Sequence, residues 1–134
     1  MTRTAYTPVT APIPERPAQL TEISSPHEIA SFLRDPVALS LSELAETLRA
    51  DERTIRRLLG DPDARAVKRH ARRLDDLRDV VSLLQETLPG EQTGRWLRAR
   101  NRGLDGRRPL EVIANDDYDA VKRAAEIYVD GDPM

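Results

Sequence analysis

The sequence of 134 residues predicts an all-α protein, and three observations support that prediction. Apolar residues recur at alternating steps of three and four along the most strongly patterned segment, which places them on one face of a long helix. Several other segments begin at a residue that caps helices and end at glycine or at an Asp-Pro pair. We find no convincing strand and no internal repeat.

The N-terminal part is expected to contain a disordered tail and then a compact helical region. Residues 1–24 hold four of the ten prolines among Thr and Ala, and they carry too little apolar surface to order themselves. Residues 25–62 are expected to begin with a short helix that Ser25 caps and Asp35-Pro36 ends. Two short amphipathic helices follow, at 41–48 and 52–60, separated by a brief turn, and Asp51 can cap the second of them. Such a pair is a candidate helix-turn-helix, with the second helix offered to a DNA major groove.

A long central helix is expected at residues 63–88. Its apolar seam consists of Val67, His70, Leu74, Leu77, Val81, Leu84 and Leu88, and Pro89-Gly90 ends it. The remaining residues, 89–134, are expected to form a small helical domain. It begins with a short helix near Glu91, continues through a loop at 100–108, and ends with two helices, the last capped by Asn115-Asp116.

Composition excludes several kinds of site. The chain has no cysteine, so a disulfide or a thiolate metal site is ruled out. Its two histidines, His27 and His70, have no third partner, so neither a metal nor a cofactor is expected. No Ser/His/Asp set or glycine-rich phosphate loop is present, and we do not expect an enzyme. No apolar run approaches the ~18 residues of a membrane span, and no signal peptide is visible, so we expect a cytoplasmic protein without membrane contact.

Charge is strongly segregated along the chain. Residues 1–48 have a net charge of −3, residues 49–108 a net charge of +6, and residues 109–134 a net charge of −5. A basic middle and an acidic end suggest two binding surfaces of opposite sign. On the second helix of the candidate helix-turn-helix, the residues expected to contact DNA are Arg53, Thr54, Arg56 and Arg57.

Two sequence patterns resemble a known family. Leu44-Ala45-x-x-Leu48 followed by Arg53-Thr54-Ile55-x-Arg57 is similar to the Xre-type helix-turn-helix. Trp96-Leu97-x-x-x-Asn101-x-x-Leu104-x-Gly106-x-x-Pro109-x-x-Val112 resembles the C-terminal toxin-binding domain of the Xre/MbcA/ParS antitoxins. The resemblance covers roughly residues 26–131. The sequence departs from the pattern at Arg100, where the family usually has proline.

The resemblance implies the antitoxin of a type II toxin–antitoxin system, which is not itself an enzyme. The implied partners are a RES-type toxin that degrades NAD, operator DNA, and further copies of the chain in a homodimer or a larger complex with toxin. The residues implied to bind the toxin are Tyr128, Val129, Asp130, Gly131 and Asp132. The implied scaffold of the domain consists of Trp96, Asn101, Leu104, Gly106 and Pro109, where Asn101 bridges a loop and Gly103 and Gly106 permit positive φ.

Two other functions stay open at this point. The chain could be a stand-alone transcriptional regulator whose C-terminal domain forms dimers. It could also be an interaction module whose helix-turn-helix no longer touches DNA. Arg49 keeps this last alternative open, because it stands in the turn where glycine is common and arginine adopts positive φ poorly.

Overall fold

The computed structural model describes residues 23–131. The segment expected to be unstructured, 1–24, lies outside this range except for Ile23 and Ser24, and Asp132 lies outside it at the other end. Ile23 is already partly buried against the core, and its carbonyl accepts a hydrogen bond from Arg78 Nη1 at 2.9 Å. Ile23 therefore packs with the helical part although the sequence placed it in the tail.

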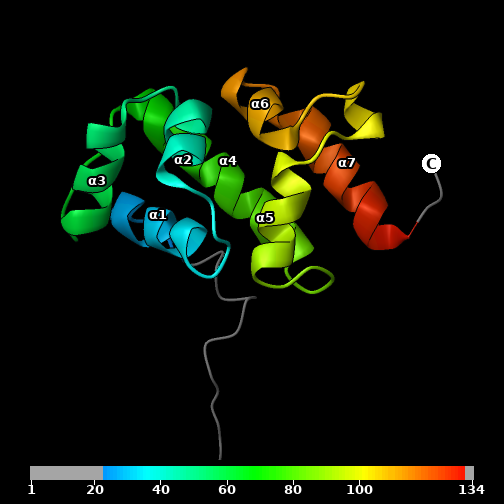
Figure 1. Cartoon of the computed structure of the whole chain (residues 1–134), viewed down its shortest axis with the longest axis horizontal. Coiled ribbons are helices and arrows are strands. Elements are labelled where there is room, and N and C mark those ends of the chain that lie inside the picture. The colour runs from blue at the N-terminus through cyan, green and yellow to red at the C-terminus, as the bar shows by residue number, and fades with distance from the viewer. Residues whose placement is uncertain (1–22, 132–134) are drawn as a thin grey trace, which may run out of the picture.

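The described residues form helices and connecting loops, which confirms the all-α prediction. The helices are α1 (Pro26–Arg34), α2 (Leu41–Leu48), α3 (Glu52–Gly60), α4 (Lys68–Leu84), α5 (Glu91–Arg98), the 3₁₀ turn η3 (Arg102–Leu104), α6 (Pro109–Ala114) and α7 (Tyr118–Asp130). Figure 1 shows α4 running through the middle, with α1, α2 and α3 toward one end and α5, α6 and α7 toward the other.

The central helix is shorter than the predicted span of 63–88. It begins at Lys68, because Asp61 accepts bonds from the backbone N–H groups of Asp63 and Ala64 and holds the preceding loop in a turn. Val67 consequently lies outside the helix in extended conformation and is 51% exposed. The rest of the seam is buried, apart from Leu88, which is partly buried beyond the end of the helix.

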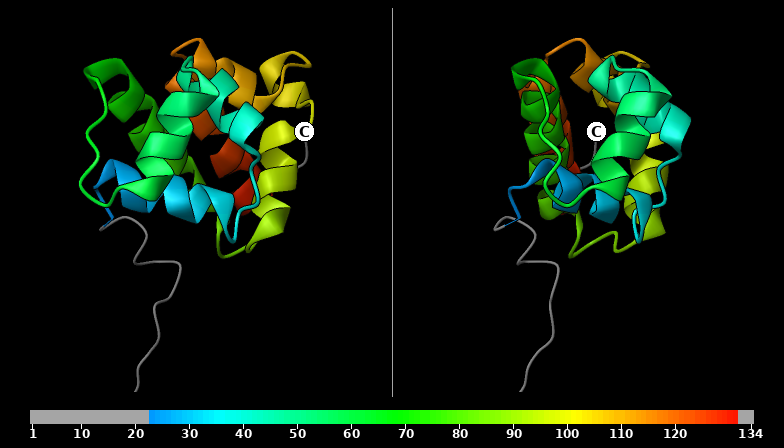
Figure 2. Two further views of the ribbon diagram at one scale, coloured as in Figure 1. Left: turned by 60° about the vertical axis from the view of Figure 1, so that its left-hand side comes forward. Right: turned by 90° about the vertical axis from the view of Figure 1, so that its left-hand side faces the viewer.

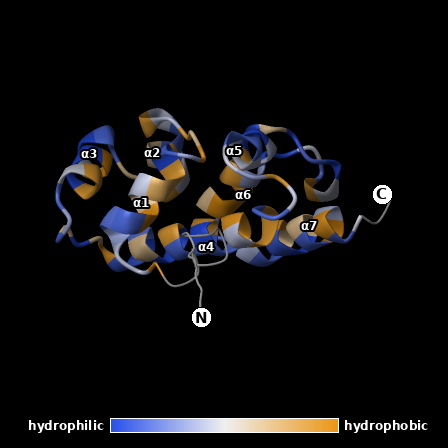
Figure 3. Ribbon diagram, turned by 90° about the horizontal axis from the view of Figure 1, so that it is seen from below, coloured by the Kyte–Doolittle hydropathy of each residue, from blue (hydrophilic) through white to orange (hydrophobic). Residues whose placement is uncertain are grey.

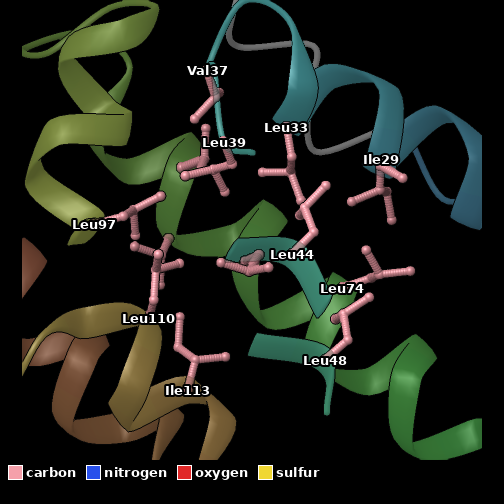
Figure 4. Close-up of a cluster of buried hydrophobic side chains, with 14 of the residues drawn as sticks. Ile29, Leu33, Val37, Leu39, Leu44, Leu48, Leu74, Leu97, Leu110 and Ile113 are labelled. Carbon is pink, nitrogen blue, oxygen red and sulfur yellow. The ribbon is translucent and has the colours of Figure 1, made fainter. Parts of the chain in front are cut away.

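One hydrophobic core serves both halves of the chain. Figure 4 shows its side chains converging from α1, α2, α4, α5 and α6; those labelled are Ile29, Leu33, Val37, Leu39, Leu44, Leu48, Leu74, Leu97, Leu110 and Ile113. Figure 3 shows hydrophobic residues gathered on the inner sides of the helices. Helix α2 packs on α3, α4 and α6, so the helix-turn-helix region and the C-terminal segment are buried against one another.

Helix α4 also carries a partly buried carboxyl group toward α7. Burial raises the pKa of Asp76 to about 6, Arg72 opposes this shift, and the neighbouring carboxylate of Asp79 adds to it. Burial likewise raises the pKa of Tyr118, at the start of α7, to about 12. The contact between α4 and α7 therefore keeps Asp76 less ionised than an ordinary aspartate.

Replacing Leu77 by alanine should lower the free energy of unfolding by about 2–5 kcal/mol. Leu77 is fully buried, so the substitution leaves a cavity in the shared core. Leu83→Ala, on the same helix but at a partly buried position, is the matched control and should cost less than half as much. Urea denaturation measures both values, and equal losses would contradict the packing described.

Replacing Asp76 by asparagine should stabilise the protein near neutral pH. The folded-state pKa is about 6 and the ordinary value is 3.8, so the unfolding free energy of the native sequence falls as pH rises between these values. Because the group is only partly buried, we expect a screened gain of about 1 kcal/mol at neutral pH and little gain near about pH 4.

The matched control is Asp75→Asn, since Asp75 is half-exposed and lies 3.4 Å from Arg78 Nη1. That variant should be neutral or slightly destabilising at neutral pH. Thermal denaturation at several pH values would contradict the assignment to Asp76 if both variants had parallel pH profiles.

Candidate functional site

Helix α3 presents a basic outer face. Asp51 begins the helix, as expected, by accepting a hydrogen bond from the backbone N–H of Thr54 at 2.8 Å. Ile55 and Leu58 are buried, whereas Arg53, Arg56 and Arg57 are exposed and Thr54 is half-buried. The four residues expected to contact DNA thus lie on one short helix, and all three arginines reach solvent.

Two of the three arginines on α3 have partners within the chain. Arg56 Nη2 lies 3.3 Å from Glu52 Oε1, one turn earlier on the helix. Arg57 Nη1 donates to the carbonyl of Arg65 at 2.9 Å and so ties the 61–67 loop to α3. Both contacts are at the surface, where they are worth little and can be exchanged for contacts with a ligand.

The turn before α3 adopts the left-handed conformation that glycine usually supplies. Arg49 has φ +56° and ψ +48°, and its backbone N–H caps α2 by donating to Ala45 and Glu46. Its side chain donates to the carbonyl of Ala114 at 2.7 Å and to Asn115 Oδ1 at 2.6 Å. The departure seen in the sequence is thus accommodated, because the arginine that occupies the turn also holds the end of α6.

Two further arginines join α2 to the C-terminal segment. Arg98 makes two hydrogen bonds to the carboxylate of Glu43, at 2.8 and 3.0 Å, and a third to the carbonyl of Ala38 at 3.0 Å. The hydrogen bond from Arg98 holds the pKa of Glu43 below its usual value. Arg108 Nη2 lies 2.6 Å from Glu46 Oε2. These contacts fix α2 against the C-terminal segment.

Arg73, on α4, changes the expected start of the last helix. Its guanidinium is 7% exposed and donates to Leu48 O at 3.2 Å and to Asp116 Oδ2 at 2.9 Å. Asp116 therefore pairs with this buried charge, and Asn115 caps the end of α6. The expectation that Asn115-Asp116 cap α7 was wrong: the N-cap is Asp117, and its side chain makes no capping bond.

The loop between α5 and α6 has the architecture expected of the resemblance. Asn101 Oδ1 accepts from the N–H of Gly103 at 2.8 Å, and Gly106 has φ +82°. Pro109 opens α6 and Leu104 is buried. One expectation was wrong: Gly103 lies within η3, and the second left-handed residue is Asp105, with φ +59°.

Trp96 and Tyr128 form an aromatic ridge between α5 and α7. The two rings are 6.4 Å apart between centroids and inclined by 60°, and Tyr128 is 44% exposed. A hollow of about 360 Å³ lies on one side of the ridge, bounded also by Leu88, Gln92 and Arg95. A second hollow, of about 260 Å³, lies on the other side against η3 and α7. We call this surface, with its two hollows, the aromatic face.

The structure gathers part of the expected toxin-binding set at this face. Tyr128 forms half of the ridge, Gly131 lines the second hollow, and Val129 and Asp130 end α7 beside it. Sequence reasoning missed Gln92, Arg95, Arg102 and Ile127, which line the two hollows. Gln92 lies four residues before Trp96, so the two side chains share one helix face. This spacing could have predicted that Gln92 lies beside Trp96.

Comparison with known proteins bears on this same segment. Residues 83–124 match the model of the antitoxin Xre/MbcA/ParS C-terminal toxin-binding domain. This match confirms the predicted resemblance to the Xre/MbcA/ParS C-terminal toxin-binding domain over residues 83–124. The matched range includes the end of α4, all of α5 and α6, and most of α7, so it covers Trp96 but stops before Tyr128.

A curated relative and a solved structure are also similar. The chain is 49% identical over 59 residues to the probable mycobacterial cidal antitoxin Rv3188 of Mycobacterium tuberculosis; this covers 44% of the chain and spans about half, 51%, of the relative. A chain in the crystal structure of the M. tuberculosis MbcT–MbcA toxin–antitoxin complex shares the fold, with a TM-score of 0.69 and 22% identity, over 84% of this chain and all of that one.

Residues 23–131 contain neither a candidate metal site nor a candidate membrane span. No group of three or more His, Asp or Glu side chains in this range could hold a metal ion. No helix among the described elements is both long enough and apolar enough to cross a membrane.

Replacing Arg49 should destabilise the protein to a degree that depends on the new residue. Alanine keeps the unfavourable left-handed conformation and loses the bonds to Ala114 and Asn115, whereas glycine relieves the conformation. We expect Arg49→Ala to be less stable than Arg49→Gly by about 1 kcal/mol in urea denaturation.

The matched control is Ala38→Gly. Ala38 is exposed and has φ +69° but no polar side chain to lose, so this change should stabilise the protein. Equal stability of the two Arg49 variants, together with a stabilised Ala38→Gly, would show that the guanidinium and not the backbone governs the turn.

Proposed function

We propose that the chain is an antitoxin, which binds a toxin through the aromatic face and binds DNA through α3. The observation that carries the proposal is the match of residues 83–124 to a toxin-binding domain. Trp96 of this segment packs on the exposed Tyr128, which lies just beyond the match, and the two rings lie between two hollows. Exposed aromatic side chains beside hollows are typical anchors of protein interfaces.

The aromatic face also offers charge of both signs. Arg95 and Arg102 line the two hollows, while Asp130 ends α7 next to Tyr128. A toxin that degrades NAD must hold the pyrophosphate with positive charge, so the acidic end of the chain could occupy that charge without being a substrate. This reasoning supports a RES-type toxin as the partner and the residues from Tyr128 to Asp132 as those that enter its active site.

DNA binding is the second half of the proposal. Arg53, at the start of α3, has no ion pair among residues 23–131 and is exposed. A helix of this kind lies in the major groove with its N-terminal residues nearest to the bases. Binding of the chain to its own operator, as a homodimer or with toxin in the cytosol, would then regulate its expression.

The aromatic face discriminates this proposal from a stand-alone regulator that uses the C-terminal segment to form dimers. A regulator would cover Trp96 and Tyr128 with a second copy and would need no other protein. An antitoxin would leave the same residues free for the toxin. The decisive experiment is co-expression with the product of the adjacent gene, followed by co-purification and a growth assay.

Replacing Tyr128 by serine should weaken neutralisation of the toxin by roughly tenfold or more, since central aromatic anchors contribute about 2 kcal/mol or more to interfaces. Val67→Ser is the matched control, because Val67 is the other large exposed hydrophobic residue of the described part and lies at the opposite end. The measurement is NAD consumption by the partner toxin at increasing concentrations of each variant.

Deletion of residues 129–134 separates the acidic end from the aromatic ridge. If the acidic end enters the toxin's active site, the deletion should reduce inhibition of the toxin, while the truncated chain still co-purifies with it. Unchanged inhibition by both Tyr128→Ser and the deletion would rule out the aromatic face as the toxin-binding surface. If the native chain purified only as a homodimer, and Tyr128→Ser prevented that dimer from forming, the result would favour the regulator instead.

A further inference from the structure

A basic hollow lies at the start of α4, away from the aromatic face. Its volume is about 380 Å³, and it is lined by Lys68, Arg69 and Arg72. All three side chains belong to exposed residues on the first turns of the helix. No acidic side chain lines this hollow, so its charge is of one sign.

These cations have little compensation from within the protein. None of the ion pairs within residues 23–131 includes Lys68 or Arg69, and Arg72 only reaches Asp116 Oδ1 at 3.8 Å. Moreover, Asp116 is already held by the buried Arg73 at 2.9 Å. An exposed group of positive charges without partners attracts anions from solution.

The charges also stand where they destabilise their own helix. Every other α-helix of the described part carries an acidic residue in its first turn, whereas α4 carries none. The positive end of a helix dipole repels cations by some tenths of a kcal/mol each. Lys68 and Arg69 are therefore unfavourable for folding as such, and a ligand with negative charge would relieve the repulsion.

The hollow lies at the same end of the molecule as the proposed DNA-binding face. Arg57, on α3, holds the carbonyl of Arg65, and the loop that contains Arg65 leads directly into Lys68. In the right-hand view of Figure 2, α3 and the start of α4 lie on opposite sides of one end of the molecule, joined by this loop. The same end of the molecule therefore carries the arginines of α3 and the cations of α4.

We propose that Lys68, Arg69 and Arg72 bind the phosphodiester backbone of DNA beside the groove that α3 enters. The inference rests on the DNA-binding half of the proposed function and extends it to a second element. A helix lying in a major groove about 12 Å wide has phosphates on either side, and elements next to it contact those phosphates without reading sequence. The positive charges of Lys68, Arg69 and Arg72 lie on flexible side chains, which can contact phosphates without reading the base sequence.

The test compares charge removal at two places. The patch variant is Lys68→Ala/Arg69→Ala, and the control is Lys122→Ala/Arg123→Ala, which removes the same exposed Lys-Arg pair from α7. Fluorescence anisotropy with the full chain measures binding to a duplex from the region upstream of its own gene and to a shuffled duplex, at several salt concentrations. Arg53→Ala is measured in parallel.

We expect the patch variant to bind both duplexes more weakly by similar factors, roughly tenfold or more at about 0.1 M salt, with a salt slope lower by about two units. The α7 control should match the native chain. Arg53→Ala should instead reduce the difference in affinity between the upstream duplex and the shuffled duplex. Because lysine is unfavourable at this helix end, Lys68→Glu should raise the melting temperature and yet bind DNA most weakly, which a merely structural role would not produce.

Binding of the patch variant within twofold of the α7 control would overturn this inference while leaving DNA binding by α3 intact. Failure of the native chain to bind either duplex would overturn both the inference and the DNA-binding half of the proposed function. Loss of toxin inhibition in the patch variant, with unchanged DNA binding, would assign the hollow to the toxin instead and would likewise overturn the inference.

Discussion

Helix α2 makes contacts with α3, α4 and α6, and it thereby joins the helix-turn-helix region to the C-terminal segment. Its apolar side lies in the core with α4 and α6. Its polar side is held by Arg98 and Arg108, which reach Glu43 and Glu46 from the C-terminal segment. A short helix of eight residues has little stability alone, so its position follows from these partners. Arg49, in the turn before α3, likewise bonds to the end of α6, so the turn is also held by the C-terminal segment.

This arrangement makes the two proposed binding regions parts of one body. Arg73 contacts the carbonyl of Leu48 at the end of α2 and Asp116 before α7. Arg49 contacts α6 from the turn of the helix-turn-helix. The arginines of α3 therefore stand on a support that includes the matched C-terminal segment, although α3 and the end of α7 that carries Tyr128 lie at opposite ends of the molecule (Figure 1).

The sequence predicted those features that depend on local spacing. The seam of α4, the cap at Asp51 and the loop at Asn101 follow from periodicity and from side chains that bond to nearby backbone. It could not predict contacts that depend on distant partners. Asp116 was expected to cap α7 because the sequence does not reveal that Arg73, 43 positions earlier, needs its carboxylate. The hollows beside Trp96 were missed for the same reason, since they lie between α5 and α7.

The shared core also determines when each part of the molecule can fold during synthesis. Residues 25–62 emerge from a ribosome before α6, and at that stage α2 lacks its contact with α6, and Arg49 lacks the carbonyl of Ala114. The helix-turn-helix can adopt its final shape only after α6 has emerged. A nascent chain therefore acquires the surface proposed to bind DNA and much of the segment proposed to bind toxin in the same folding step, and a product interrupted before α6 has neither.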